Sequence, residues 1–213
     1  MNEFERLLDH YVLAHSEPEA PLLAELDHEA HVHLLHGRMV SGHLQGRLLS
    51  AFSHMIRPRR ILELGTYVGY SALCLAEGLA EGGRLLTIDR DDEIEDMARA
   101  YIGRSAFAGC IDFKIGDALD LLPTIEGLFD LVFIDADKRE YKAYYDLVFD
   151  KVPPGGFILA DNTLWDGKVL APLERGDRQT AALLEFNDYV AADRRVEKFI
   201  LPLRDGITII RKK

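Results

Sequence analysis

The sequence predicts an α/β fold in which a doubly wound, mostly parallel sheet is preceded by helices. From residue 60 onward, short apolar runs alternate with longer amphipathic stretches, which is the pattern of right-handed βαβ units. Near the end of the chain, two strand-like runs flank Arg204-Asp205-Gly206, a tight-turn sequence that predicts an antiparallel hairpin. We therefore expect a seven-stranded sheet whose last strand is reversed.

The first 58 residues predict helices. Apolar side chains recur at helical spacing from Phe4 to Tyr11 and again from Leu44 to Ile56. Ser41 is a candidate N-cap for the second stretch. Pro18 and Pro21 both suit the first turn of a helix between the two stretches.

The strands expected after this segment are short, and several are continuous apolar runs, as in parallel strands that are buried on both faces. Helices separate them, for example over 71–80 and 93–101. No repeat or linker divides the 213 residues, so we expect a single domain with a helical segment over 1–58 and an α/β core over 59–213. The expected strands are 61–64, 85–88, 111–115, 131–134, 157–160, 196–203 and 207–210.

Composition narrows the class of protein. The net charge of -11 disfavours binding to nucleic acid or to an anionic membrane. No run approaches the roughly 18 apolar residues of a membrane helix, and the acidic N-terminus lacks the basic region of a signal peptide. Cys74 and Cys110 form no CxxC pair, which argues against a disulfide framework or a thiolate zinc site. We expect a cytoplasmic enzyme that acts on a small molecule.

A glycine turn follows the first expected strand, in the sequence Glu63-Leu64-Gly65-Thr66-Tyr67-Val68-Gly69-Tyr70-Ser71. Glycine at such a turn lets a ligand approach the backbone closely. A dinucleotide site requires G-x-G-x-x-G, but Tyr67 occupies the middle glycine position here, which disfavours NAD and FAD. S-adenosylmethionine, an adenosine cofactor without phosphates, fits better. The alternative for Gly65 is simple packing between helix and strand.

Asp89 ends the second expected strand, where an acid commonly binds ribose hydroxyls. The alternative is that it caps the helix that follows.

Three oxygen ligands follow two neighbouring strands: Asp135 after the fourth, and Asp161 with Asn162 after the fifth. Because the carboxyl ends of parallel strands share one edge, we expect these side chains to converge. Oxygen ligands favour a divalent cation, with Mg²⁺ first and Ca²⁺ or Mn²⁺ as alternatives. The alternative for a single aspartate is a capping or surface role, and Asp137 in particular is a candidate helix cap.

Lys138 lies three residues after Asp135, near the start of the next helix. The helix dipole and a nearby cation both disfavour a charged amine at this position. The neutral amine could act as the general base for a phenol proton. The alternative is a salt bridge to Asp137 or Glu140.

These motifs together resemble the cation-dependent O-methyltransferases, the family that includes catechol and caffeoyl-CoA O-methyltransferases, and most closely its bacterial members. The similarity covers nearly the whole chain. It also lies in Met39-Val40-Ser41 with Gln45-Gly46, in Ile134-Asp135-Ala136-Asp137-Lys138 with Tyr141, in Asp161-Asn162-Thr163-Leu164-Trp165 with Gly167, and in the Asp205-Gly206 turn.

The resemblance implies a Rossmann-like class I methyltransferase fold, a homodimer, and a catechol-like phenolic substrate that is methylated by direct SN2 transfer. It implies Lys138 as the base, and Asp135, Asp161 and Asn162 as the cation ligands. It places the methionine end of S-adenosylmethionine against Glu63, Gly65, Tyr70 and Ser71, with backbone contacts from Val40 and the ribose on Asp89. The turn Gly116-Asp117-Ala118 would border the adenine, and Asp135 would serve both sites.

Two features depart from the family pattern. Gly42 stands where the family often has proline or another residue, in the segment that covers the cofactor. His28, His31, His33 and His36 are unusually close together, but their spacing does not place all four on one helical face, so we expect an exposed or substrate-proximal helix. A methyltransferase with a non-catechol substrate, an NAD-dependent oxidoreductase and a non-catalytic adenosine sensor remain alternatives.

Overall fold

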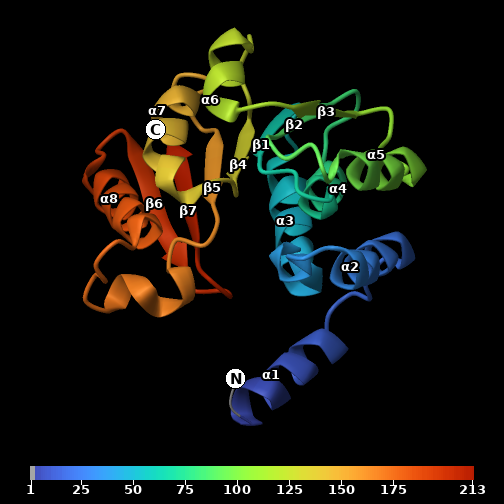
Figure 1. Ribbon diagram of the computed structural model, residues 1–213. Helices are drawn as coiled ribbons and strands as arrows, with labels where there is room; N and C mark the ends of the chain where they lie inside the picture. Colours follow the sequence, from blue (N-terminus) through green and yellow to red (C-terminus); the bar gives the residue numbers. More distant parts are fainter. Residues whose placement is uncertain (1–2) are drawn as a thin grey trace.

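The computed structural model describes residues 3–213, so the first two residues of the expected helical segment lie outside the described part (Figure 1). Across these residues a seven-stranded sheet has the order β3-β2-β1-β4-β5-β7-β6. β7 pairs antiparallel with both of its neighbours, whereas the pairs between β1 and β2, β2 and β3, β1 and β4, and β4 and β5 are parallel. The predicted mostly parallel sheet with a reversed last strand is confirmed.

The central strands are buried on both faces, as their apolar runs predict. Every residue of β4 is buried, and β1 and β5 each have one partly exposed residue at the start. The strands are β1 (Arg60–Leu64), β2 (Arg84–Asp89), β3 (Ile111–Ile115), β4 (Leu131–Ile134), β5 (Phe157–Ala160), β6 (Val196–Leu201) and β7 (Ile207–Lys212).

Helices cover both faces of the sheet (Figure 1). The α-helices are α1 (Glu3–Ala14), α2 (Pro21–His33), α3 (Gly42–Ile56), α4 (Tyr70–Ala76), α5 (Glu95–Arg104), α6 (Ala118–Leu121), α7 (Tyr141–Phe149) and α8 (Arg178–Ala192). The 3-10 helices are η1 (Gly37–Met39), η2 (Leu122–Thr124), η3 (Lys138–Glu140) and η4 (Trp165–Leu170).

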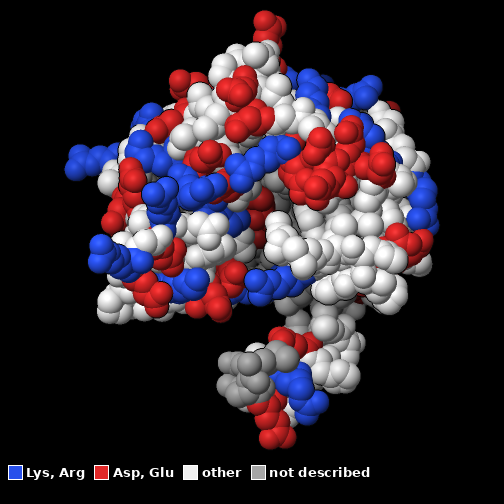
Figure 2. Space-filling model, viewed as in Figure 1, with Lys and Arg blue, Asp and Glu red and all other residues white. Residues whose placement is uncertain are grey.

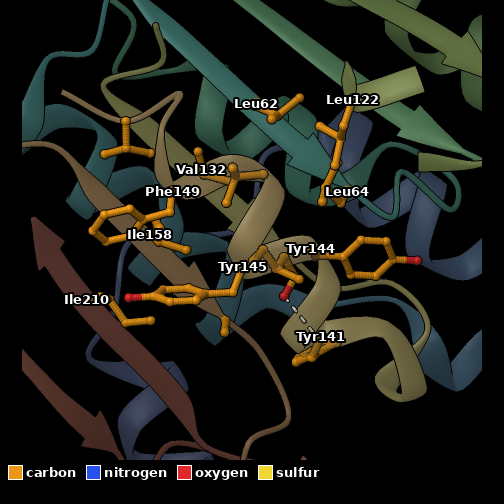
Figure 3. Close-up of a cluster of buried hydrophobic side chains, with 14 of the residues drawn as sticks. Leu62, Leu64, Leu122, Val132, Tyr141, Tyr144, Tyr145, Phe149, Ile158 and Ile210 are labelled. Atoms are coloured by element: carbon orange, nitrogen blue, oxygen red, sulfur yellow. Dashed lines mark hydrogen bonds between the residues drawn. The ribbon is translucent and has the colours of Figure 1, made fainter. Parts of the chain in front are cut away.

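Two apolar clusters form the core, one on each side of the sheet. Figure 3 shows the first, in which the aromatic side chains of α7, including Tyr145 and Phe149, pack on strand residues such as Leu62, Val132 and Ile158. The second joins α2, α3 and α4 to the opposite face, around Leu49 and Phe133. α1 extends away from the rest of the molecule, and its apolar side chains are exposed (Figure 1).

Several element boundaries differ from those that the sequence predicts. Pro21 is in the first turn of α2 as expected, but Pro18 precedes that helix, so its predicted place in the first turn is wrong. Ser41 occupies the N-cap position of α3, yet its side chain makes no capping hydrogen bond. β6 ends at Leu201 rather than at residue 203, because Pro202 has no N–H to continue the ladder.

The helix expected over 71–80 is α4 and ends earlier, at Ala76. Gly78 then lies against the end of α3, where a Cβ atom would be 2.2 Å from the backbone nitrogen of His54. This close approach turns the chain toward β2. The helix expected over 93–101 is α5 and runs from Glu95 to Arg104.

Within residues 3–213 we find no helix whose length and apolar character would let it cross a bilayer.

Candidate active site

A cavity of about 820 Å³ lies at the carboxyl edge of the sheet. Figure 2 shows a hollow on this face with acidic side chains inside it and basic side chains along its rim. The predicted site residues that line it are Val40, Gly65, Tyr70, Ser71, Asp89, Asp117, Ala118, Asp135, Lys138, Asp161 and Asn162. The chain therefore brings together residues from all the loops that follow β1, β2, β3, β4 and β5.

The glycine turn after β1 is shaped by a close backbone approach. Gly65 has φ +97°, and a Cβ atom there would lie 2.0 Å from the carbonyl oxygen of Asp135. Only glycine fits where the loops after β1 and β4 meet so closely. Tyr67 also has a positive φ, +45°, and Asp89 holds this strained residue by accepting its backbone N–H at 2.6 Å. The hydrogen bond to Asp89 therefore holds the glycine turn against the end of β2.

Asp89 does not cap the next helix, because the N-cap position of α5 is Ile94. Its other carboxylate oxygen accepts the backbone N–H of Asp91 at 3.0 Å. Each oxygen keeps a further lone pair, and the side chain borders the cavity. The predicted ribose-binding role is compatible with this geometry.

Glu63, the remaining predicted cofactor residue, is not among the residues that line the cavity and has no exposed surface. Thr87 donates a hydrogen bond of 2.6 Å to its Oε2, but Oε1 is buried without a partner among residues 3–213. Burial raises the pKa of Glu63 to about 8, and the nearby hydroxyl groups of Ser71 and Thr87 oppose this rise. A buried carboxyl oxygen without a partner fits a ligand that brings a positively charged N–H group.

Tyr70 lines the cavity, but its hydroxyl group contacts a residue that precedes α2. Its phenol hydroxyl donates to Glu19, in the connection between α1 and α2. The ring lies close to Gly46, where a Cβ atom would be 2.8 Å from the ring. Its position at the first residue of α4 places Tyr70 in the cavity wall beside Ser71.

On the far side of the cavity, the loop after β3 supplies Asp117 and Ala118. Asp117 is the N-cap of α6 and accepts the backbone N–H of Leu119 at 2.8 Å. Val40 follows η1 as its C-cap, is buried and lines the cavity. All three residues line the cavity, and Asp117 and Ala118 belong to the turn that the resemblance assigns to adenine.

The three predicted cation ligands come together through the backbone at the strand ends. The N–H of Asp135 donates to the carbonyl of Leu64, and the N–H of Asp161 donates to that of Ile134. Asp161 is 2% exposed, and burial together with the charge of Asp135 raises its pKa. Two carboxyl groups and the amide of Asn162, which all line the cavity, are a donor set that fits a hard divalent cation.

Asn162 adopts φ +56°, a left-handed conformation that asparagine tolerates. Its backbone N–H donates to Asp161 Oδ1 at 2.7 Å, and its side-chain nitrogen lies 3.4 Å from Asp205 Oδ2. With the nitrogen on the side of Asp205, the amide oxygen is the acceptor atom of this side chain, and it is the atom that a cation would bind.

Lys138 begins η3 and is buried beside this cluster. Its Nζ donates to Asp135 Oδ1 at 2.7 Å and to the hydroxyl of Tyr141 at 2.8 Å. The alternative that Lys138 pairs with Asp137 or Glu140 is therefore wrong. Asp137 caps η3 and forms ion pairs with Arg90 and Arg139, which keep the pKa of its carboxyl below the usual range. The predicted capping role of Asp137 is confirmed.

Two residues that support the site were given no role by the sequence analysis beyond their place in the resemblance. Tyr141 is fully buried, accepts from Lys138 and donates to the carbonyl of Asp161 at 3.0 Å. Gln45, in α3, donates to Asp161 Oδ2 at 2.5 Å.

The histidine-rich segment is exposed at all four positions. Nδ1 of His31 lies 2.8 Å from the backbone carbonyl of Asp27. Within the described part of the chain, no group of three or more His, Cys, Asp or Glu side chains is arranged to hold a metal ion. The predicted cation site differs from such groups because it has two carboxylates and an amide.

The O-methyltransferase family model matches residues 13–213. The chain is 37% identical to caffeoyl-CoA O-methyltransferase 1 of Arabidopsis thaliana over 179 residues, which cover 79% of this chain and 69% of the plant protein. Among solved structures, it is similar to the O-methyltransferase TomG of Streptomyces achromogenes in complex with SAM, with a TM-score of 0.92, 28% identity and full coverage of both chains. It is also similar to the O-methyltransferase of Bacillus cereus in complex with SAH, with a TM-score of 0.91, 30% identity and 97% coverage of each chain.

The fold and the site thus define an enzyme that transfers methyl groups. The chain belongs to the O-methyltransferase family, which confirms the resemblance drawn from its motifs. This membership argues against the NAD-dependent oxidoreductase and the non-catalytic sensor.

Proposed function

We propose that this enzyme transfers the methyl group of S-adenosylmethionine to one hydroxyl of a small catechol-like substrate, with a divalent cation, Mg²⁺ first, held beside it. The observation that supports this proposal best is that the cofactor half and the acceptor half of the cavity meet at Asp135. Its backbone packs on Gly65 in the cofactor half, and its carboxylate contacts Lys138 in the other half. The relatives support this proposal, because their names specify caffeoyl-CoA as the substrate and SAM or SAH as the bound ligand.

The cofactor half suits S-adenosylmethionine. The free Oε1 of Glu63 would accept from the α-ammonium group of the methionine end. The Gly65 turn leaves room for the backbone to approach the ligand, and Asp89 would accept from the ribose hydroxyls. Val40, Asp117 and Ala118 would enclose the adenine.

The acceptor half suits two adjacent hydroxyls. Asp135, Asp161 and Asn162 would hold the divalent cation, which when bound would lower the pKa of a substrate hydroxyl and align a vicinal diol by chelation. Trp165 lines the same part of the cavity, and its buried indole N–H has no partner within residues 3–213. Its ring offers an apolar wall for an aromatic substrate.

Lys138 would take the proton from the hydroxyl. Its Nζ donates to Asp135 Oδ1, one of the proposed cation ligands, so the amine lies beside the place where the hydroxyl would bind. Transfer would form a bond between the substrate oxygen and the methyl carbon and break the carbon–sulfur bond of S-adenosylmethionine, whose electron pair would stay on sulfur. The products are S-adenosylhomocysteine, the methyl ether and a proton on Lys138. Most of the acceleration would come from alignment.

The test compares a catechol with its matched monophenol, with and without chelator. We expect the catechol to have a kcat/KM at least about 100-fold higher, because it alone can chelate and stay aligned. Excess EDTA should abolish turnover. Equal kcat/KM values for the two acceptors, or full turnover in a metal-free preparation, would refute the proposal.

Two variants of Lys138 separate its role as a proton acceptor from the effect of its positive charge. Lys138→Ala should lower kcat by about 10²–10⁴-fold with little change in cofactor affinity. Lys138→Arg keeps the ion pair with Asp135 but cannot deprotonate, so it should be as slow. Lys142→Ala, which removes an exposed lysine paired with Asp146 on α7, is the control. A Lys138→Arg variant with wild-type kcat would show that only the positive charge matters.

A cytoplasmic location and a homodimer are further parts of this proposal, and they rest on the composition and the family resemblance.

A further inference from the structure

The hairpin between β6 and β7 contains an arginine in an unfavourable backbone conformation. Arg204 has φ +49°, in the left-handed region where side chains other than glycine are strained. Its guanidinium nevertheless reaches back over the start of α3, where Nη1 is 3.6 Å from the position that a Cβ atom of Gly42 would occupy. Strain of this kind persists where the surrounding contacts require it.

The contact that Arg204 makes is to Gln45. Its Nη1 donates to Gln45 Oε1 at 3.3 Å, while Nε2 of the same amide donates to Asp161 Oδ2 at 2.5 Å. Gln45 is 3% exposed and Asp161 2% exposed. The amide of Gln45 could in principle point either its oxygen or its nitrogen at Asp161. Because the guanidinium of Arg204 can only donate, it binds the amide oxygen, and the amide nitrogen then faces the carboxylate of Asp161.

We propose that Arg204 is a positioning residue for the cation site, acting through Gln45 to hold the carboxylate of Asp161 in one orientation. This inference rests on the proposed function. With Asn162 N–H on Oδ1 and Gln45 on Oδ2, both oxygens of Asp161 are oriented before a cation arrives. Partners of this kind orient the ligands of metal sites, and their loss commonly weakens metal affinity by about 10–100-fold.

The direction in which cation affinity changes when Arg204 is removed distinguishes a positioning role from a purely electrostatic one. Removing a positive charge near a cation site strengthens cation binding by Coulomb's law. Removing a positioning residue weakens it. Arg38, a second exposed arginine that lines the cavity, provides the matched control, because its loss removes the same charge.

The experiment measures Mn²⁺ affinity of the full-length protein by electron paramagnetic resonance. We expect Gln45→Leu to weaken it about 10–100-fold, and Arg204→Ala, one hydrogen bond further out, about 3–10-fold. Arg38→Ala should leave it unchanged or slightly tighter. Adding Arg204→Ala to Gln45→Leu should have no further effect, because the two act through one contact. Thermal unfolding of each variant verifies that it is folded.

Wild-type or tighter Mn²⁺ binding by Arg204→Ala would overturn the inference, as would an equal loss in the Gln45→Leu background. Arg204→Lys should recover part of the affinity, since lysine also donates only. A wild-type protein that binds no Mn²⁺ at all would refute the cation site of the proposed function and this inference with it. Binding by the wild type together with unchanged variants would refute the inference alone.

Discussion

Glu63 gives the most direct test of the cofactor half of the site. Burial raises its pKa to about 8, and its Oε1 has no partner within residues 3–213. At pH 7 a carboxyl group with this pKa is about 0.9 protonated. An α-ammonium group beside Oε1 favours the ionised carboxylate, so binding of S-adenosylmethionine should expel most of that proton.

The expected result is the release of close to 0.9 proton per cofactor at pH 7, falling toward zero above about pH 9, where the free enzyme is already ionised. The assay is titration calorimetry of the cofactor in buffers of different ionisation enthalpy, because the slope of the observed heat gives the number of protons exchanged. Glu63→Gln, which keeps the shape of the side chain, should reduce the slope to near zero. A slope near zero in the wild type, or the same slope in both proteins, would refute the reasoning.

The raised pKa of Glu63 also makes the free energy of unfolding depend on pH. The pKa of Glu63 is higher in the folded protein than its ordinary value of 4.5, so the folded state binds the extra proton between these two values. The stability that Glu63 contributes is complete below about pH 4.5 and is lost as the pH rises to about 8, by up to roughly 5 kcal/mol. In the absence of cofactor, Glu63→Gln should therefore gain stability over the wild type as pH rises through this range, measured by urea unfolding.

Two other predictions concern binding. Asp89→Ala should weaken S-adenosylmethionine binding about 10- to 150-fold, because it removes a charge-assisted hydrogen bond of roughly 1.5–3 kcal/mol. Asp92→Ala, in the exposed loop nearby, is the control, and an unchanged dissociation constant for Asp89→Ala would leave Asp89 only its role in holding the Tyr67 turn. The homodimer is tested by light scattering: we expect a dimer at micromolar concentration, since α1 exposes Phe4 and Tyr11 on one apolar stripe, and a monomer would contradict it.

The sequence carried enough information to place the parts of the site that lie on the strand ends. Apolar runs such as 131–134 mark buried parallel strands, and the residue after each must lie at the ligand edge because all these strands point the same way. Asp135, Asp161 and Asp89 follow from this rule without knowledge of side-chain contacts. The cavity contains each of them.

The parts that the sequence could not place depend on contacts between distant segments. Gln45 in α3 donates to Asp161, which is 116 residues further along the chain, and no pattern in α3 indicates this contact. The hydroxyl of Tyr70 contacts Glu19, which no periodicity of α4 indicates. Arg204 reaches Gln45 only because β7 lies between β5 and β6, and hairpin spacing predicts the turn but not its neighbour in the sheet.

Insertion of β7 beside β5 also makes the hairpin turn a support for the loop that carries the proposed cation ligands Asp161 and Asn162. The carbonyl of Gly206 accepts the N–H of Thr163, and that of Asp205 accepts the N–H of Leu164. Gly206 is buried with φ +80°, and a Cβ atom there would lie 2.4 Å from Cγ of Leu164. Since the backbone of Leu164 is held by the turn itself, its side chain has little freedom to move away.

Gly206→Ala should therefore destabilise the protein by more than the loss of glycine freedom. Gly176→Ala is the matched control, because Gly176 has φ +90° and, in the described chain, nothing within 4 Å of the added Cβ. Both variants bear the left-handed strain of about 1–2 kcal/mol, and the clash should add about 1–3 kcal/mol to Gly206→Ala alone. Urea unfolding measures the difference, and the double variant Leu164→Ala with Gly206→Ala should remove the added clash. Equal losses for the two alanine variants would show that the loop moves independently of the hairpin, and that the turn does not support the proposed cation site.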